Sequence, residues 1–474
     1  MKPARILVYL VGSLCLALAL ALVVTRDDDP VVRSAEVVVP VGVDRSTCPS
    51  GTGARVTCVS LDVPEDYNDP EIAQVSLFAA RIEPPFDPIG SPLLFIGAGM
   101  GEVAVGDLIA WQQLTRDLER EVILLDLRGV GSSEPRLGCA DAFRAEWLQS
   151  ELDTEDLDDL KQANADDLTT CRSRLERDHP LEAYTLDAFA SDIDQVRERL
   201  GVEQWTIAAG GRATDVARRA EELFPDRVES LVLLGAAHAS DDPQADRYRY
   251  AVEVYEETID EGVRASLERI TQRLENQSIV FPVQVRGRTE RVLVSDESVL
   301  PTITKALEDP EFRTGLPTFV TGRLGEGEWR SIALLRGAQR GELFGRSTPV
   351  AVAVACSVPG SEQADVTWLE AEGFDSRWTS LLDDPIMVPG VCEAWEVVSP
   401  GEPIGAPSSQ TLVINGRYDV DAPSSAAAVI DEAWNQATTV VLPEAARPSL
   451  LDACVISLVT DFLSGDDPTL GSEC

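Results

Sequence analysis

The sequence predicts an α/β fold with a mostly parallel, doubly wound sheet and an inserted, largely helical cap region. Up to residue 238, short and continuously apolar strands alternate with helical segments. This alternation is typical of a parallel sheet covered by helices on both faces. The rhythm changes over residues 239–405, where charged helical patterns dominate, and an apolar strand follows at residue 410. A second part of the sheet therefore follows the cap.

The start of the chain predicts export. Residues 6–24 are an uninterrupted apolar run after a basic start, long enough to span a bilayer with the positive flank in the cytoplasm. Ala19-Leu20-Ala21 offers a small-residue cleavage site, so a cleaved signal peptide is the alternative. We expect the following order: cytoplasmic tail 1–5, anchor or signal peptide 6–24, spacer 25–45, core 46–238, cap 239–405 and core 406–474.

The composition is strongly acidic. The formal net charge is -41, from 81 acidic and 40 basic residues. So negative a field repels phosphate backbones and anionic lipid surfaces, and it favours solubility. Nucleic acid is therefore not expected as a partner, and contact with the membrane is expected only through the N-terminal segment.

Eight cysteines follow the apolar run, an even number that suggests disulfides in an exported protein. Eight cysteines allow 105 pairings, and free buried thiols are the alternative. The spacing forms four sequence-local couples, and the absence of a Cys-x-x-Cys or Cys/His cluster predicts no metal site. No cofactor is expected either. We predict neighbour pairing, namely Cys48–Cys58, Cys139–Cys171, Cys356–Cys392 and Cys454–Cys474.

The elements of the sheet follow from apolar runs bounded by turn residues. Helices are expected where apolar residues repeat at helical spacing, as over 186–200 with Gly201 as a C-terminal stop. The other predicted helices are 212–224 and one around 454–463. A hairpin is predicted at 278–294 within the cap. The predicted strands of the sheet are 60–67, 73–82, 92–96, 121–126, 205–208, 230–235, one from 410, and 438–443.

The stretch Gln204–Ala217 organises the rest of the chain. A buried strand runs into a tight turn of small residues, Ala209-Gly210-Gly211, and then into a helix. This is the layout of a nucleophile elbow, in which a turn lifts a serine above the sheet edge. Gly211 occupies the serine position. A non-glycine residue in such a strained turn costs about 1–3 kcal/mol, so glycine relieves strain there.

A second glycine-rich loop follows the strand at 92–96. Its sequence is Gly97-Ala98-Gly99-Met100-Gly101, and loops of this kind let backbone N–H groups converge on a ligand. By itself such a loop is weak evidence, since most are only turns. We expect Gly99, Met100 and Arg212 to line an oxyanion site or pocket.

With these pieces in place, residues 46–474 resemble the exported tripeptidyl-aminopeptidase-like branch of the α/β-hydrolases, a relative of the proline iminopeptidases. No single piece is specific, but their order and spacing are. The pieces that carry the resemblance are Leu61–Tyr67, the loop at 97–101, Asp126–Pro135 with Cys139, Ala183-Tyr184-Thr185, the helix end at Asp192–Gly201, Trp205, Gly416–Pro423, Cys454 and Cys474.

The resemblance implies a serine nucleophile, a histidine base and a carboxylate that orients the histidine. Asp419 retains the acid position, Gly211 replaces the serine, and Arg447 stands where the histidine belongs. His179 is expected in a surface loop, and His238 precedes the cap, so neither is expected to substitute. An ion pair between Arg447 and Asp419 is predicted, because an unpaired buried carboxylate is costly.

The leading hypothesis is therefore an exported, membrane-anchored α/β-hydrolase-fold protein that has lost serine-hydrolase catalysis. It would bind a peptide-like, envelope-derived or small-molecule ligand at the sheet edge. One alternative is an active peptidase or esterase with a displaced nucleophile, either Thr214 or a serine of the cap. The other is a purely structural envelope protein.

Overall fold

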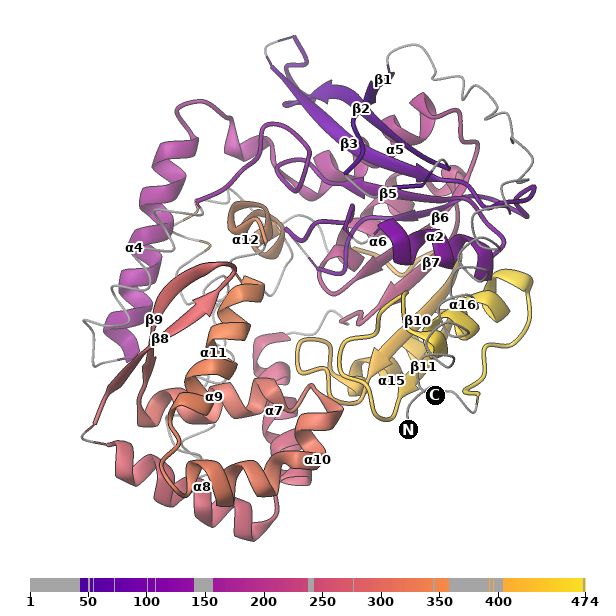
Figure 1. The fold of residues 1–474 in the computed structure, drawn as a ribbon. Helices are drawn as coiled ribbons and strands as arrows, with labels where there is room; N and C mark the ends of the chain where they lie inside the picture. Colours follow the sequence, from indigo (N-terminus) through magenta and orange to yellow (C-terminus); the bar gives the residue numbers. More distant parts are fainter. Residues whose placement is uncertain are drawn as a thin grey trace, which may run out of the picture. The chain divides into compact units, whose positions relative to one another are not determined.

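A computed structural model describes the greater part of the chain (Figure 1). The described residues are 43–49, 52–53, 55–71, 73–99, 101–106, 108–139, 157–237, 243–275, 277–343, 346–357, 392, 395, 404–471 and 474. The expected tail, the anchor at 6–24 and most of the spacer lie outside these residues. Among the described residues, no helix combines the length and apolar character needed to cross a membrane.

A nine-stranded sheet forms the centre of the fold, in the order β1-β2-β3-β5-β4-β6-β7-β10-β11. The first three strands pair antiparallel with one another, and β3 pairs antiparallel with β5. All pairings from β5 to β11 are parallel. The strands are β1 Val43–Ser46, β2 Val56–Pro64, β3 Gln74–Ile82, β4 Leu93–Phe95, β5 Val122–Asp126, β6 Trp205–Gly210, β7 Val228–Leu234, β10 Gln410–Gly416 and β11 Ala437–Leu442. The predicted mostly parallel sheet is confirmed.

Helices cover both faces of the sheet because both faces of the central strands are apolar. One hydrophobic cluster joins the sheet to α5 (Leu186–Arg199), α6 (Ala213–Leu223) and α15 (Ser424–Ala433). A second cluster joins the opposite face to α2 (Leu108–Asp117) and α16 (Ala453–Ser464). The chain reverses after α5 at Gly201, whose φ of 71° is the left-handed conformation expected of a glycine stop.

The inserted region has a hydrophobic cluster of its own, between residues 251 and 333, which Val420 of the core joins. The predicted hairpin is present as the antiparallel pair β8–β9. The elements of this region are α7 Pro243–Thr258, α8 Glu261–Leu274, β8 Ile279–Val285, β9 Arg288–Val294, α9 Asp296–Ala306, α10 Pro310–Thr318, η3 Phe319–Leu324 and α11 Arg330–Leu343. We call residues 243–343 the cap below. The outer limits of 239–405 stay a prediction.

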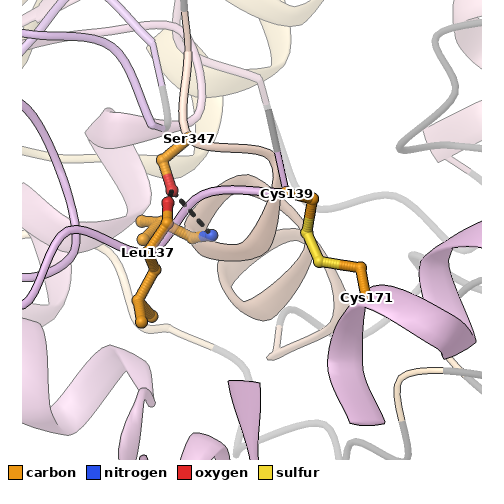
Figure 2. Close-up of a disulfide and its surroundings, with 5 residues drawn as sticks. Leu137, Cys139, Cys171 and Ser347 are labelled. Carbon is orange, nitrogen blue, oxygen red and sulfur yellow. Dashed lines mark hydrogen bonds between the residues drawn. A yellow bond between two sulfur atoms is a disulfide. The ribbon is translucent and has the colours of Figure 1, made fainter. Parts of the chain in front are cut away.

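The next helix, α12 (Thr348–Ser357), packs with the sheet rather than with the cap cluster. All ten of its residues are buried, and its Val and Ala side chains belong to the cluster of β5, α5 and β6. Figure 2 shows the start of this helix, where the Ser347 hydroxyl donates to the Leu137 carbonyl (2.6 Å). The remaining described helices are α4 Leu157–Leu175, η1 Leu181–Ala183 and η2 Pro225–Arg227.

The four predicted disulfides are confirmed: Cys48–Cys58, Cys139–Cys171, Cys356–Cys392 and Cys454–Cys474. Each closes a loop between sequence neighbours, as the spacing indicated. Cys139–Cys171 joins the chain after β5 to α4 beside Ser347 (Figure 2). Each disulfide therefore joins cysteines that are neighbours in the sequence, and none of the described cysteines forms a long-range pair.

A buried ion pair accounts for several residues of the motifs quoted above. Arg128 is fully buried and contacts both oxygens of Asp192, at 2.6 and 2.7 Å. Tyr67 donates to the same carboxylate (2.8 Å), and the Arg128 guanidinium lies 5.5 Å from the ring centroids of Tyr67 and Tyr184. These residues hold β2, the loop after β5 and α5 together. Their role is structural.

His179 lies in the loop between α4 and η1, as predicted, and it also belongs to the neighbouring part of this network. Its Nδ1 lies 3.0 Å from the carboxylate of Glu65, and the side chain is 24% exposed. Glu65 also accepts the Tyr184 hydroxyl at 2.7 Å. The buried carboxylate of Glu65 needs hydrogen-bond donors, and nothing in the sequence indicates that Glu65 is buried in the turn after β2.

Candidate functional site

The elbow is formed as the sequence predicts. β6 extends through Gly210, and Gly211 follows with φ of 50°, in the left-handed region. The Gly211 N–H donates to the Leu234 carbonyl at the end of β7 (2.8 Å). Arg212 returns to right-handed backbone and precedes α6. The turn therefore has the geometry that presents a nucleophile, but residue 211 has no side chain.

The glycine loop packs directly on this turn. The Gly210 N–H donates to the Gly97 carbonyl (2.9 Å). A Cβ placed on Gly210 would lie 2.8 Å from the Ala98 carbonyl oxygen, and one on Gly211 would lie 3.2 Å from the same atom. The backbone group nearest the missing side chain is thus a hydrogen-bond acceptor. The Ala98 carbonyl therefore limits the space open to a side chain at residue 211.

Asp419 lies beside the elbow at the end of the sheet. Its side chain is buried, and its Oδ1 accepts the backbone N–H groups of Asp421 (3.0 Å) and Ala422 (3.2 Å). Oδ2 lies 2.9 Å from the Cβ position of Gly235, which is itself 4.0 Å from the Gly211 nitrogen. The structure therefore brings the acid position and the vacated nucleophile position together.

Arg447 also lies at the site, but its ion-pair partner differs from the predicted one. Its Nη2 lies 3.0 Å from Oδ2 of Asp421, and its Nη1 lies 3.7 Å from Glu102. Within the described residues, no hydrogen bond or ion pair joins Arg447 to Asp419, so that predicted pair is wrong. The reason is local: Asp419 turns inward onto its own backbone, and Asp421 presents the carboxylate that the guanidinium can reach.

The loops that carry these residues are interlocked. Tyr418 N–H donates to the Ala445 carbonyl (3.0 Å). A Cβ on Gly416 would lie 1.6 Å from the Ala446 carbonyl oxygen, so only glycine permits the loop after β11 to cross there. On the other side, Gly99 lies against the Glu102 carboxylate. Contacts therefore run without a break from Gly211 through the glycine loop to Arg447, Asp421 and Asp419.

The charged groups around Asp419 and Asp421 shift the pKa values of both carboxylates. Burial, and to a lesser extent the neighbouring Asp421 carboxylate, raises the pKa of Asp419 from 3.8 to about 7. Burial acts in the same direction on Asp421, but the cations Arg247, Lys305 and Arg447 hold its pKa well below its ordinary value. The negative charge at this site therefore resides on Asp421, and Asp419 takes up a proton near neutral pH.

Two of the hydroxyl groups considered as displaced nucleophiles, Thr214 and one serine of the predicted cap 239–405, are engaged elsewhere. Thr214 is buried and donates to the Gly211 carbonyl at 2.6 Å. Ser347, which follows the cap and touches the glycine loop through its N–H bond to Gly101 (2.6 Å), donates its hydroxyl to Leu137 (Figure 2). Neither hydroxyl is paired with a base, which a serine or threonine nucleophile requires.

Some residues of the site were missed by sequence reasoning. Asp421 lies within the motif Gly416–Pro423, but nothing in the sequence distinguished it from Asp419. Glu102 directly follows the glycine loop and carried no signal. Arg247, Lys305 and Glu308 belong to the cap, whose docking cannot be read from the sequence. Met100 and His238 lie outside the described residues, so their predicted roles cannot be placed.

In the described part of the chain, no group of three or more His, Cys, Asp or Glu residues is placed to hold a metal ion. A cavity of about 470 Å³ lies at the antiparallel end of the sheet, lined by residues of β1, β2 and β3 and by Ser132 and Glu134. None of Gly211, Asp419 and Arg447 lines it.

Comparison with known proteins places the chain among hydrolases by fold. Residues 92–278 match the family model described as the alpha/beta hydrolase fold. The chain is similar to the serine protease Hip1 of Mycobacterium bovis and of Mycobacterium tuberculosis. It is 24% identical over 471 residues, covering 88% of this chain and 87% of the relative. Together with the sheet described above, the match shows the α/β-hydrolase fold.

Two similar solved structures are a proline iminopeptidase and an esterase. Proline iminopeptidase from Mycobacterium smegmatis is 13% identical with a TM-score of 0.40, covering 86% of this chain and 98% of that chain. An esterase from Thermogutta terrifontis is 16% identical with a TM-score of 0.37, with the same shares covered.

Proposed function

We propose that this α/β-hydrolase-fold protein is an extracytoplasmic, membrane-anchored protein that has lost serine-hydrolase catalysis and acts by binding. One observation carries the proposal: the elbow is intact in its backbone, but its reactive position is Gly211. Arg447 at the base position supports it, because a guanidinium cannot accept a proton in a protein. The four disulfides support an extracytoplasmic location.

The ligand class is taken from the relative's name. Hip1 is named a serine protease, so a peptide-like ligand is the one we propose at the sheet edge. Ligands of open α/β sheets bind outside the carboxyl ends of the strands, and the loops after β4, β6, β7 and β10 meet there. Binding needs neither the serine nor the histidine.

An active enzyme with a displaced nucleophile is disfavoured by the two hydroxyls described above. Both Thr214 and Ser347 donate to backbone carbonyls. Using either one would break that hydrogen bond, and neither hydroxyl has a base beside it to take its proton.

Turnover of peptidyl and aminoacyl anilides tests the loss of catalysis. We expect no turnover above background by the unmodified protein, and none by Gly211→Ser, because Arg447 remains. Losing a triad nucleophile costs about 10⁶-fold, and losing the base as well adds little, since the residues act as a unit. Gly211→Ser with Arg447→His is the smallest change that restores both groups. Robust turnover by the unmodified protein would refute the proposal.

A further inference from the structure

One loop of the core receives contacts from three helices of the cap. The loop is residues 417–424, between β10 and α15, and it carries Asp419. Arg247 of α7 and Lys305 of α9 both contact Asp421, the latter at 3.8 Å. These partners are far apart in the sequence, so the contacts are made by docking of the cap and not by local folding.

Asp421 is the hub of these contacts. Its carboxylate is shared by Arg247, Lys305 and Arg447, which come from two cap helices and from the loop after β11. The Asp421 side chain is 36% exposed and that of Arg247 is 12% exposed. The ion pairs are therefore partly screened by solvent, and salt can compete with them.

Contacts of other kinds flank the hub. The Arg313 guanidinium of α10 lies 3.5 Å from the ring centroid of Tyr418, and it also donates to the Glu444 carbonyl. The Tyr250 hydroxyl of α7 lies 2.7 Å from the Ser424 hydroxyl and donates to the Arg417 carbonyl. Arg417 in turn pairs with Glu257 of α7 at 2.6 Å. The loop is thus held by the cap on both sides of Asp421.

We propose that Asp421 is the hub of an ionic clamp that holds the cap against the 417–424 loop and so controls access to the vacated elbow. The clamp is formed by Arg247, Lys305 and Arg447 around Asp421, and ionic strength is the variable that loosens it. Arg447, at the predicted base position, joins the loop after β11 to the same carboxylate, so the cap cations and a core cation share one anion. This inference goes beyond the proposed function, since a clamp operates whether or not the elbow is catalytic.

Hydrogen–deuterium exchange of the full-length protein tests the clamp, with Asp421→Asn as the main variant. Asn keeps the shape and removes the charge. We expect amides of α7 and of residues 417–424 to exchange about tenfold faster, the factor to which 1.4 kcal/mol corresponds. Exchange in β6 and β7 should stay unchanged. Arg247→Gln removes a cation from the cap instead, and it should give the same pattern.

Asp226→Asn is the matched control. It removes the same charge from an exposed residue for which no side-chain contact is seen, and its amides should exchange like those of the unmodified protein.

Added salt tests the clamp in a second way. About 1 M NaCl shortens the Debye length to about 3 Å, so it should speed exchange of the same amides in the unmodified protein but have less effect in Asp421→Asn. Unchanged exchange in Asp421→Asn would overturn the clamp. Equal acceleration in β6 and β7 would overturn it too, by showing general destabilisation.

Discussion

At the scale of the residue, Gly211 determines what the elbow can do. Its φ of 50° is left-handed, and a Cβ there would lie 3.2 Å from the Ala98 carbonyl oxygen. A side chain must therefore adopt a strained backbone conformation and push on the glycine loop. The serine that catalysis would need is costly to the fold, and glycine removes that cost.

Gly211→Ser should therefore lower the free energy of unfolding by about 1–3 kcal/mol, the usual cost of a non-glycine residue in a strained conformation. Gly201→Ser is the matched control, since its φ is 71° and a Cβ there meets nothing within 4 Å. Urea denaturation of both variants separates the cost of backbone strain, which both share, from the cost of the contact with Ala98, which only Gly211→Ser makes. Gly211→Ser should cost more than Gly201→Ser, and an equal or smaller cost would show that the glycine loop yields freely.

Asp419 should make stability depend on pH. Its pKa is raised by burial from 3.8 to about 7, so between these values the folded state binds a proton that the unfolded state has released. Its contribution is therefore present at low pH and is lost as the pH rises toward 7. Asp421, with its lowered pKa, titrates below this window.

We expect the free energy of unfolding of the unmodified protein, minus that of Asp419→Asn, to fall as the pH rises from about 5 to about 8. Asn cannot titrate, so the subtraction isolates Asp419. Chemical denaturation at a series of pH values measures the difference. A difference that is flat, or that rises with pH, would mean that Asp419 is ionised throughout.

At the scale of the element, the sheet was readable from the sequence and the docking of the cap was not. Apolar runs such as Val122–Asp126 and Trp205–Gly210 are buried along their whole length, and such runs have few alternatives to a central strand. By contrast, Asp419 and Asp421 are two residues apart and chemically identical. Which of them turns inward and which meets Arg447 depends on backbone donors and cap cations that only the folded chain brings together.

The position of α12 in the fold could not be predicted from the sequence either. Its sequence, Thr348–Ser357, is apolar throughout, so it has no polar face to show which core it joins. The structure places it in the hydrophobic cluster that the sheet shares with α5, and Val350 lies against Gly129. Helical periodicity fails as a guide whenever a helix is buried on all sides.

The Cys139–Cys171 disulfide should hold this region together. It spans 32 residues and joins the chain after β5 to α4. The chain-entropy model gives roughly 3–4 kcal/mol for a loop of that length. Cys139→Ser with Cys171→Ser should lower the free energy of unfolding by that order, measured by denaturant titration against the unmodified protein under non-reducing conditions. A loss well under 1 kcal/mol would show that hydrophobic packing holds α4 without the disulfide.

At the scale of the whole molecule, the net charge and the residues at the sheet edge are both consistent with the proposed binding function. A net charge of -41 opposes association with nucleic acid and anionic surfaces, and the sheet edge is where we propose that a ligand binds. That edge retains the elbow, the acid position and the interlocked loops of a hydrolase. It lacks a nucleophile at the elbow and a proton acceptor at the base position.

Labelling of the purified full-length protein with a fluorophosphonate probe tests this central claim most directly. The probe reacts with an activated serine or threonine hydroxyl, and the account predicts no labelling of the unmodified protein. Gly211→Ser with Arg447→His serves as the variant in which labelling is possible. Labelling of the unmodified protein that disappears in Thr214→Val or Ser347→Ala would contradict the account and identify a displaced nucleophile.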